Sequence, residues 1–171
     1  MTNSNGRLRA MDKSDLDKVL AWRNDQSIRR YMLNNQEIPA KEHYAWFDRV
    51  SIDPISKLYI YENHGIDMGF ISFKNAYKGS ISEWGFYKSP DAPKGVGLDL
   101  GKVALQTAFT DLNIHKVYGN VIASNTKSVL LHQTLGFDQE GILKEHHFDG
   151  ENYHDLICFG LIKYATNTLL K

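Results

Sequence analysis

Two glycines, two residues apart, stand directly ahead of a helical pattern in the stretch Lys94-Gly95-Val96-Gly97-Leu98. The first N–H groups of a helix have no intrahelical acceptor, and the aligned peptide dipoles place about half a positive charge at that end. Because glycine has no Cβ, an anion can approach this part of the backbone closely. The loop is therefore competent to bind a diphosphate, although two glycines also serve simply to turn the chain.

The spacing excludes the two best-known phosphate loops. No Gly-Lys-Ser/Thr ending follows, as a nucleotide-hydrolysing P-loop requires. The dinucleotide fingerprint needs a third glycine, but that position holds Leu100.

Three side chains have the chemistry for proton transfer or for contact with a substrate. Glu83 and Tyr87 lie on one face of a predicted strand with Gly85 between them, so Glu83 could take an amine proton and Tyr87 could hydrogen-bond an acceptor. His132 shares a helical stripe with Ser128, and histidine titrates near neutral pH. The structural alternatives are a paired strand carboxylate, a core tyrosine and a structural helix histidine.

Other reactive patterns are weak. We expect no metal site, because the histidines near the C-terminus have no paired cysteine spacing and strand alternation sends His146 and His147 to opposite faces. We find no Ser-His-Asp or Cys-His pattern for a covalent nucleophile. Cys158, the only cysteine, lies in an apolar run and is interpreted as a buried small residue.

The overall composition limits the class of protein. Lysine plus arginine number 20, as do aspartate plus glutamate, so there is no electrostatic field for nucleic acid or an anionic membrane. The N-terminus is polar, and no later stretch approaches the length of a membrane span. We expect one cytoplasmic domain over 1–171, with its core at about 8–164, that binds small molecules. A homodimer is left open.

Hydrophobic patterns predict elements in the order β-α-α-β-β-β-α-β-α-β-β. Ser14 is the predicted N-cap of the first helix, and Pro39 is expected in the first turn of the second. Helices that cover a mixed, mostly antiparallel sheet of about seven strands make a three-layer α/β (α+β) fold. The expected strands are 7–11, 57–61, 68–73, 81–87, 116–122, 137 onward and 153–161; the later helices follow Gly97 and Asn125, the last ending at Gly136.

This arrangement resembles the pantetheine-binding core of the GNAT superfamily of N-acetyltransferases. There a glycine loop and a helix hold the coenzyme A diphosphate, beside a second helix that begins with Asn and ends in Gly-Phe; Asn125 to Phe137 matches that helix. The resemblance runs from about Leu8 to Tyr164 and implies acetyl-CoA as cosubstrate, no metal, and direct acetyl transfer. It implies cofactor contacts from Phe86, Lys94, Gly95, Val96, Gly97, Leu98, Asn125, Lys127 and Ser128.

Two positions depart from the superfamily pattern. Ala92 stands where Gln or Arg usually precedes the first loop glycine, so a phosphate contact must come from elsewhere, from Lys94 or from the backbone alone. His132 stands where a tyrosine often protonates the coenzyme thiolate, and we predict that His132 takes that role.

Several stretches also resemble the branch of the superfamily that acts in the pseudaminic acid pathway. That resemblance implies acetylation of the 4-amino group of UDP-4-amino-4,6-dideoxy-N-acetyl-β-L-altrosamine, whose product feeds a nonulosonic acid that decorates flagellin or surface polysaccharide. Arg23, His43, Lys78 and Tyr87 are then expected to bind the sugar nucleotide. The stretches are Trp22-Arg23-Asn24, Met32, Glu42-His43, Trp46-Phe47, Glu83 to Tyr87, and Pro90 to Gly95.

Two alternatives stay open. The C-terminal half also looks like enzymes that acetylate ribosomal protein N-termini or polyamines, but a polyamine pocket should be rich in carboxylates, and only Glu37, Glu42 and Glu83 are available. A non-catalytic module that binds acyl-CoA would keep the glycine loop while losing acceptor-side groups. The retained acceptor-side residues favour an enzyme.

Overall fold

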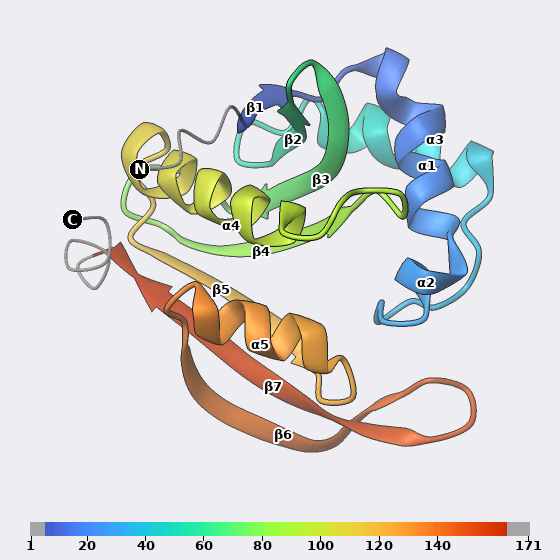
Figure 1. Ribbon diagram of the computed structural model, residues 1–171, viewed down its shortest axis with the longest axis vertical. Coiled ribbons are helices and arrows are strands. Elements are labelled where there is room, and N and C mark those ends of the chain that lie inside the picture. The colour runs from blue at the N-terminus through green and yellow to red at the C-terminus, as the bar shows by residue number, and fades with distance from the viewer. Residues whose placement is uncertain (1–5, 164–171) are drawn as a thin grey trace.

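The fold is a seven-stranded sheet with helices on both faces (Figure 1). The structure, a computed structural model, describes residues 6–163. A 3-10 turn (Lys13–Asp15) precedes α1, and a π-helical turn (Thr107–Asp111) follows α4. The elements are β1 (Gly6–Ala10), α1 (Leu16–Asn24), α2 (Gln26–Arg29), α3 (Ala40–Val50), β2 (Lys57–Asn63), β3 (Ile66–Lys74), β4 (Ile81–Lys88), α4 (Val96–Gln106), β5 (Lys116–Ile122), α5 (Thr126–Thr134), β6 (Asp138–Phe148) and β7 (Tyr153–Ile162).

The sheet is mixed and mostly antiparallel, as predicted. Its strand order is β1-β2-β3-β4-β5-β7-β6, and β4 and β5 are the parallel pair because the α4 crossover joins them. Their pairing is short and ends at Glu83 opposite Tyr118. Beyond that point the two strands part, which opens the sheet between them (Figure 1).

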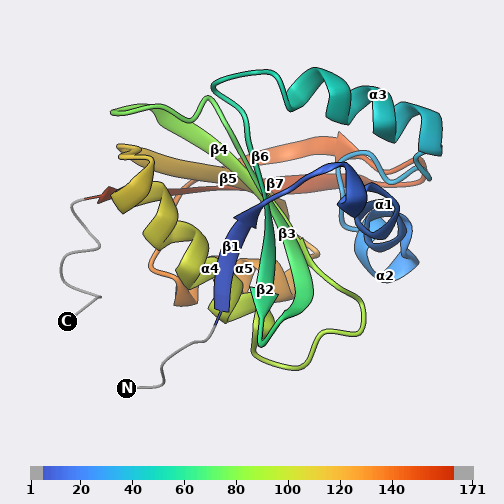
Figure 2. The ribbon, with the colours of Figure 1, turned by 90° about the horizontal axis from the view of Figure 1, so that it is seen from above.

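Two apolar cores hold the layers together, one on each face of the sheet. Figure 2 shows α4 and α1 on opposite sides of the strands. Successive strand residues point to opposite faces, so Ile60 enters one core and Tyr61 the other. The larger core packs α4 against the sheet through Leu100 and Ala104, and Ala108 of the π-helical turn continues this contact. The smaller core packs α1 and α3 through Met11, Leu16, Val19, Trp22, Phe47, Ile60 and Phe70.

The helix ends show which local signals decided the boundaries. The prediction of Ser14 as N-cap is wrong, because the Asp12 carboxylate accepts the Ser14 amide (2.8 Å) and α1 starts only after this capping turn. Pro39 is the N-cap residue of α3. Asn125 caps α5 through its bond from the Ser128 amide (3.2 Å), and Gly136 follows the helix at φ 86°, both as predicted.

A four-charge cluster ties the first strand and helix to β3. Both oxygens of the buried Asp15 accept from the Arg9 guanidinium, at 2.8 and 2.7 Å. Asp67 accepts from Arg9 (2.7 Å) and from Lys18 (2.5 Å), and Lys18 also donates to Asp15 (3.0 Å). These bonds hold the pKa of both carboxyl groups below the usual range despite burial, which acts in the opposite direction.

Candidate active site

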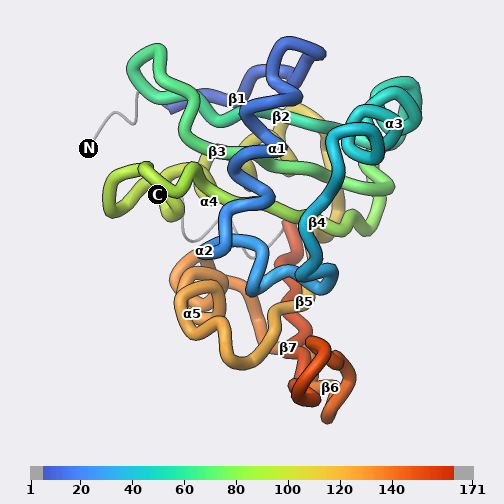
Figure 3. The backbone as a smooth tube through the Cα atoms, turned by 90° about the vertical axis from the view of Figure 1, so that its right-hand side faces the viewer, coloured from blue at the N-terminus to red at the C-terminus, as the bar shows by residue number. Residues whose placement is uncertain are grey.

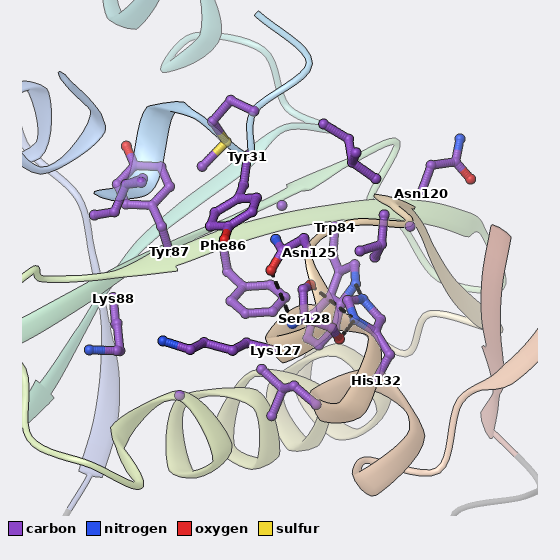
Figure 4. Close-up of a pocket in the computed structure, with 18 of the residues that line it drawn as sticks. Tyr31, Trp84, Phe86, Tyr87, Lys88, Asn120, Asn125, Lys127, Ser128 and His132 are labelled. Carbon is purple, nitrogen blue, oxygen red and sulfur yellow. Dashed lines mark hydrogen bonds between the residues drawn. The ribbon is translucent and has the colours of Figure 1, made fainter. Parts of the chain in front are cut away.

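A cavity of about 490 Å³ lies where β4 and β5 part, between the glycine loop and α5 (Figure 4). Its walls come from the C-terminal halves of both strands, the start of α4, the first two turns of α5, and residues 27–33. Figure 3 shows how the segment after α2 comes to lie near α5 although it is far away in the chain. The cavity is therefore built at the topological break in the sheet.

Most of the predicted cofactor residues line this cavity. Gly95 adopts φ 92° as the N-cap of α4, in the left-handed region that favours glycine. Lys94 is exposed and outside the lining, while the Val96 side chain is buried in the core beneath the helix. The predicted residues in the lining are Phe86, Gly95, Gly97, Leu98, Asn125, Lys127 and Ser128.

Two lysines supply positive charge to this cavity. Lys127 reaches from α5 and Lys88 from the end of β4, and both side chains lie on the same side of the cavity in Figure 4. Lys88 donates to the Ala92 carbonyl (3.1 Å), so it also holds the loop in which Ala92 replaces the usual polar residue. Sequence reasoning missed Lys88. The pair and the helix start together fit the diphosphate of acetyl-CoA.

His132 lies at the inner wall of the cavity, with 3% of its surface exposed. The Trp84 indole N–H donates to its Nε2 (3.2 Å), and its Nδ1 lies 2.8 Å from the Ser128 carbonyl oxygen. An indole nitrogen only donates and a carbonyl only accepts, so both bonds require the neutral imidazole with its proton on Nδ1. Burial also lowers the pKa of His132, which favours the neutral imidazole.

Glu83 does not line the acetyl-group end of this cavity or any other part of it. It belongs to the part of β4 that is still paired with β5, and its carboxylate accepts from Lys74 (2.9 Å). The side chain is 39% exposed and belongs to neither lining. The structure thus does not bring the predicted base together with His132.

A second cavity, of about 530 Å³, lies among α1, α3, β3 and β4. Tyr87 lines both cavities, so it marks the junction between them. Burial raises the pKa of the Tyr87 hydroxyl, which therefore stays protonated at neutral pH. Arg23 and His43 also line the second cavity, as expected for acceptor residues, whereas Lys78 lies in the exposed turn before β4.

The second cavity carries more positive than negative charge. Arg23 and Arg49 line it, against the single carboxylate of Glu42. Trp46 adds a broad aromatic surface, with its ring packed edge-on against Phe70. Sequence reasoning missed Trp46 and Arg49 as lining residues; the two point to the same cavity because they lie three positions apart on α3.

Two residues that line the second cavity each have a buried nitrogen atom with no hydrogen-bond partner among the residues described. They are Nη1 of Arg23 and Nε2 of His43. The other Arg23 nitrogen, Nη2, donates to the Asn34 carbonyl (2.5 Å), and His43 stacks on Trp46 at 5.3 Å. Burial lowers the pKa of both side chains. Unpaired buried donors and acceptors are costly, so a ligand that displaced the groups covering these atoms and bonded to them would gain binding energy.

Comparison with known proteins decides the family. The profile of the Acetyltransferase (GNAT) domain matches residues 7–138. The chain belongs to the GNAT acetyltransferase family. It is accordingly an acetyl-CoA-dependent N-acetyltransferase, which confirms the expected activity and cosubstrate.

The relatives bear on the acceptor. Spermidine N(1)-acetyltransferase of Vibrio cholerae serotype O1 is 27% identical over 157 residues, 90% of this chain and 91% of the relative. The Escherichia coli K12 enzyme of the same name is 26% identical over 88% of this chain and 82% of its own length. A crystal structure of the Vibrio cholerae spermidine N-acetyltransferase with CoA and spermine superposes with a TM-score of 0.88 at 26% identity, over 95% of this chain and 98% of that one.

These relatives confirm the GNAT fold of the sheet and helices. They do not bear out the resemblance to the pseudaminic acid branch, and their names favour the polyamine alternative over the sugar nucleotide.

Within residues 6–163, no helix is long and apolar enough to cross a membrane. The same residues contain no group of three or more His, Cys, Asp or Glu side chains placed to hold a metal ion.

Proposed function

We propose that this GNAT enzyme acetylates a primary amine on an acceptor that also carries an anionic group, of which the UDP-linked 4-amino sugar is the specific example. The observation that carries the proposal is the charge of the second cavity. Arg23 and Arg49 line it, and Nη1 of Arg23 is buried without a partner in the described chain. A guanidinium forks well onto phosphate oxygens, so these side chains suit a diphosphate.

The first cavity is assigned to acetyl-CoA. The amides at the start of α4, with Lys88 and Lys127, would hold its diphosphate. Gly85 is exposed on β4 beyond the part that pairs with β5, where backbone groups can pair with the pantetheine amides as an added strand does. When bound, acetyl-CoA supplies a thioester that a neutral amine attacks directly as the C–S bond breaks.

The junction at Tyr87 is where the two substrates would meet. An acceptor held by Arg23 and Arg49 at its anionic end would extend its amine past Tyr87 towards the first cavity. The protonated Tyr87 hydroxyl can donate to a sugar oxygen, which positions the amine without removing its proton. Aromatic contact with Trp46 would favour a planar base at the far end.

Polyamine acetylation is the second candidate, because the reported relatives carry that name. A polyamine is a chain of cations and would need carboxylates along its path. The second cavity offers Glu42 but sets two arginines beside it. Like charges in a partly buried site repel, so this lining disfavours spermidine.

The test is an acceptor panel. Pure protein with acetyl-CoA is offered a UDP-linked 4-amino-4,6-dideoxy sugar, spermidine, or an N-terminal peptide, and thiol release is followed. We expect the highest kcat/KM for the sugar nucleotide, with spermidine at least tenfold lower, which is the discrimination that about 1.4 kcal/mol provides. Turnover confined to spermidine or to the peptide would overturn the proposed acceptor and leave the acetyltransferase assignment intact.

A further inference from the structure

The parting of β4 and β5 is occupied by one aromatic side chain. The strands pair as far as Glu83 and Tyr118, so Trp84 and Gly119 are the first residues beyond the pairing. The Trp84 ring lies against Gly119: a Cβ at that glycine would be 3.0 Å from Cδ1 and from Nε1 of the indole. Trp84 is 5% exposed. Its indole therefore crosses from β4 onto β5 at the point where the cavity opens.

His132 holds this indole in place from the α5 side. It accepts the Trp84 N–H, and the two rings meet edge to face at 5.4 Å and 90°. The imidazole is fixed in turn by its bond to the Ser128 carbonyl and by stacking on Phe159 of β7 at 4.9 Å and 16°. Phe137 stacks on the indole at 5.0 Å and 22°. The result is a packed, hydrogen-bonded cluster of side chains that joins β4, β5, α5 and β7.

We infer that His132 is a positioning residue, which fixes Trp84 and thereby the separation of β4 and β5 at the inner end of the acetyl-CoA cavity, and that it is not the acid that protonates the coenzyme thiolate. Both imidazole nitrogens are committed to partners inside the protein. The one proton of the neutral ring is donated to the Ser128 carbonyl, away from any leaving group. This inference concerns acetyl transfer itself and does not depend on the identity of the acceptor.

The chemistry balances without a proton from His132. As the amide bond forms and the C–S bond breaks, the acylated nitrogen loses one proton and the departing thiolate takes one up. Nothing is oxidised or reduced, and solvent at the cavity can carry the proton from one atom to the other. An acid role for His132 would instead require a protonated imidazole, whose Nε2–H would point at the Trp84 N–H.

The decisive variants are His132→Gln and His132→Phe. A glutamine amide can accept from the indole and donate to the Ser128 carbonyl, but it does not titrate. We expect His132→Gln to keep kcat within about threefold, with an unchanged pH-rate profile. His132→Phe leaves the indole N–H without an acceptor, so Trp84 is no longer held in place, and we expect acetyl-CoA binding to weaken by about tenfold, which corresponds to about 1.4 kcal/mol.

An acid role makes the opposite prediction. If His132 protonates the thiolate, His132→Gln should lower kcat by about 10²- to 10⁴-fold at unchanged acetyl-CoA affinity and remove one limb of the pH profile. That result would overturn the inference. Calorimetry with CoA measures the affinity separately from turnover, and thermal melting identifies a variant that fails to fold.

Nuclear magnetic resonance of the cofactor-free wild type gives a readout that needs no activity. The nitrogen shifts of His132 should report the Nδ1–H tautomer at pH 7, with a hydrogen-bonded Trp84 indole proton. An imidazole that is protonated at pH 7 would contradict the inference even if every variant were inactive.

Discussion

Replacing Arg23 with alanine should raise the KM for the acceptor by roughly 10- to 150-fold, which is the cost of losing hydrogen bonds to a charged group of about 1.5–3 kcal/mol. Arg23 lines the second cavity, and one of its nitrogens is buried there without a partner in the described chain. The acetyl-CoA cavity does not include it, so the KM for acetyl-CoA should stay unchanged. Steady-state kinetics with each substrate varied in turn measures both values.

The Arg23 prediction has matched controls. Arg49→Ala should act in the same direction, because it removes the other cation of the cavity. Lys78→Ala should change neither KM, since this lysine lies in an exposed turn outside both linings. If the acceptor is a polyamine, Arg23→Ala removes a repelling charge and should improve its binding. A lower KM for spermidine in the variant would therefore contradict the anionic acceptor.

Removal of Asp15 should lower the free energy of unfolding by about 3 kcal/mol, at the lower end of the range for breaking a buried ion pair. Asp15 is 1% exposed and accepts from Arg9 twice, from Lys18 and from the Asp12 amide. In Asp15→Ala the two cations lose this partner, and the Asp12 amide in the capping turn ahead of α1 loses its acceptor. Denaturation by urea, monitored by tryptophan fluorescence, measures the change.

The same carboxylate predicts a pH dependence with a defined sign. Its pKa in the folded protein is lowered from the ordinary 3.8, chiefly by bonds from Arg9, the Asp12 amide and Lys18, against burial. The stabilisation is therefore complete above about pH 4 and is lost as the pH falls through the folded-state pKa. On acidification the free energy of unfolding should therefore fall more for wild type than for Asp15→Ala. Asp48→Ala is the control, because the pair of Asp48 with Lys13 is exposed and 3.5 Å long. This variant keeps Asp15, so its free energy of unfolding should fall on acidification as much as that of wild type. A fall as small as that of Asp15→Ala would contradict the prediction.

The parts of the site that sequence patterns predicted are those with local signals. The glycine loop and the Asn-capped α5 are encoded by neighbouring residues, and both have the expected form. The second cavity was predicted only in part. Arg23 and His43 came from resemblance, whereas Trp46 and Arg49 join them only because α1, α3 and β3 pack together.

The predicted roles of Glu83 as the base and His132 as the acid depend on contacts between strands and helices that local sequence patterns do not encode. Strand alternation predicts which residues share a face of the sheet, but it does not predict the residue at which two neighbouring strands separate. Glu83 lies just before the parting of β4 and β5, and is paired with Lys74; Tyr87 lies beyond it and reaches both cavities. The hydrogen bond between Trp84 and His132 joins residues 48 positions apart, so no local pattern could reveal that both imidazole nitrogens are occupied.

The most direct test of the anionic acceptor is a calorimetric titration of UDP into the protein saturated with CoA, with spermidine titrated in parallel. UDP carries the diphosphate and the planar base but no amine, so it reports on the second cavity without turnover. We predict that UDP binds and that Arg23→Ala abolishes its heat, while spermidine gives none. Binding of spermidine with no heat from UDP would contradict the assignment of this cavity to an anionic acceptor.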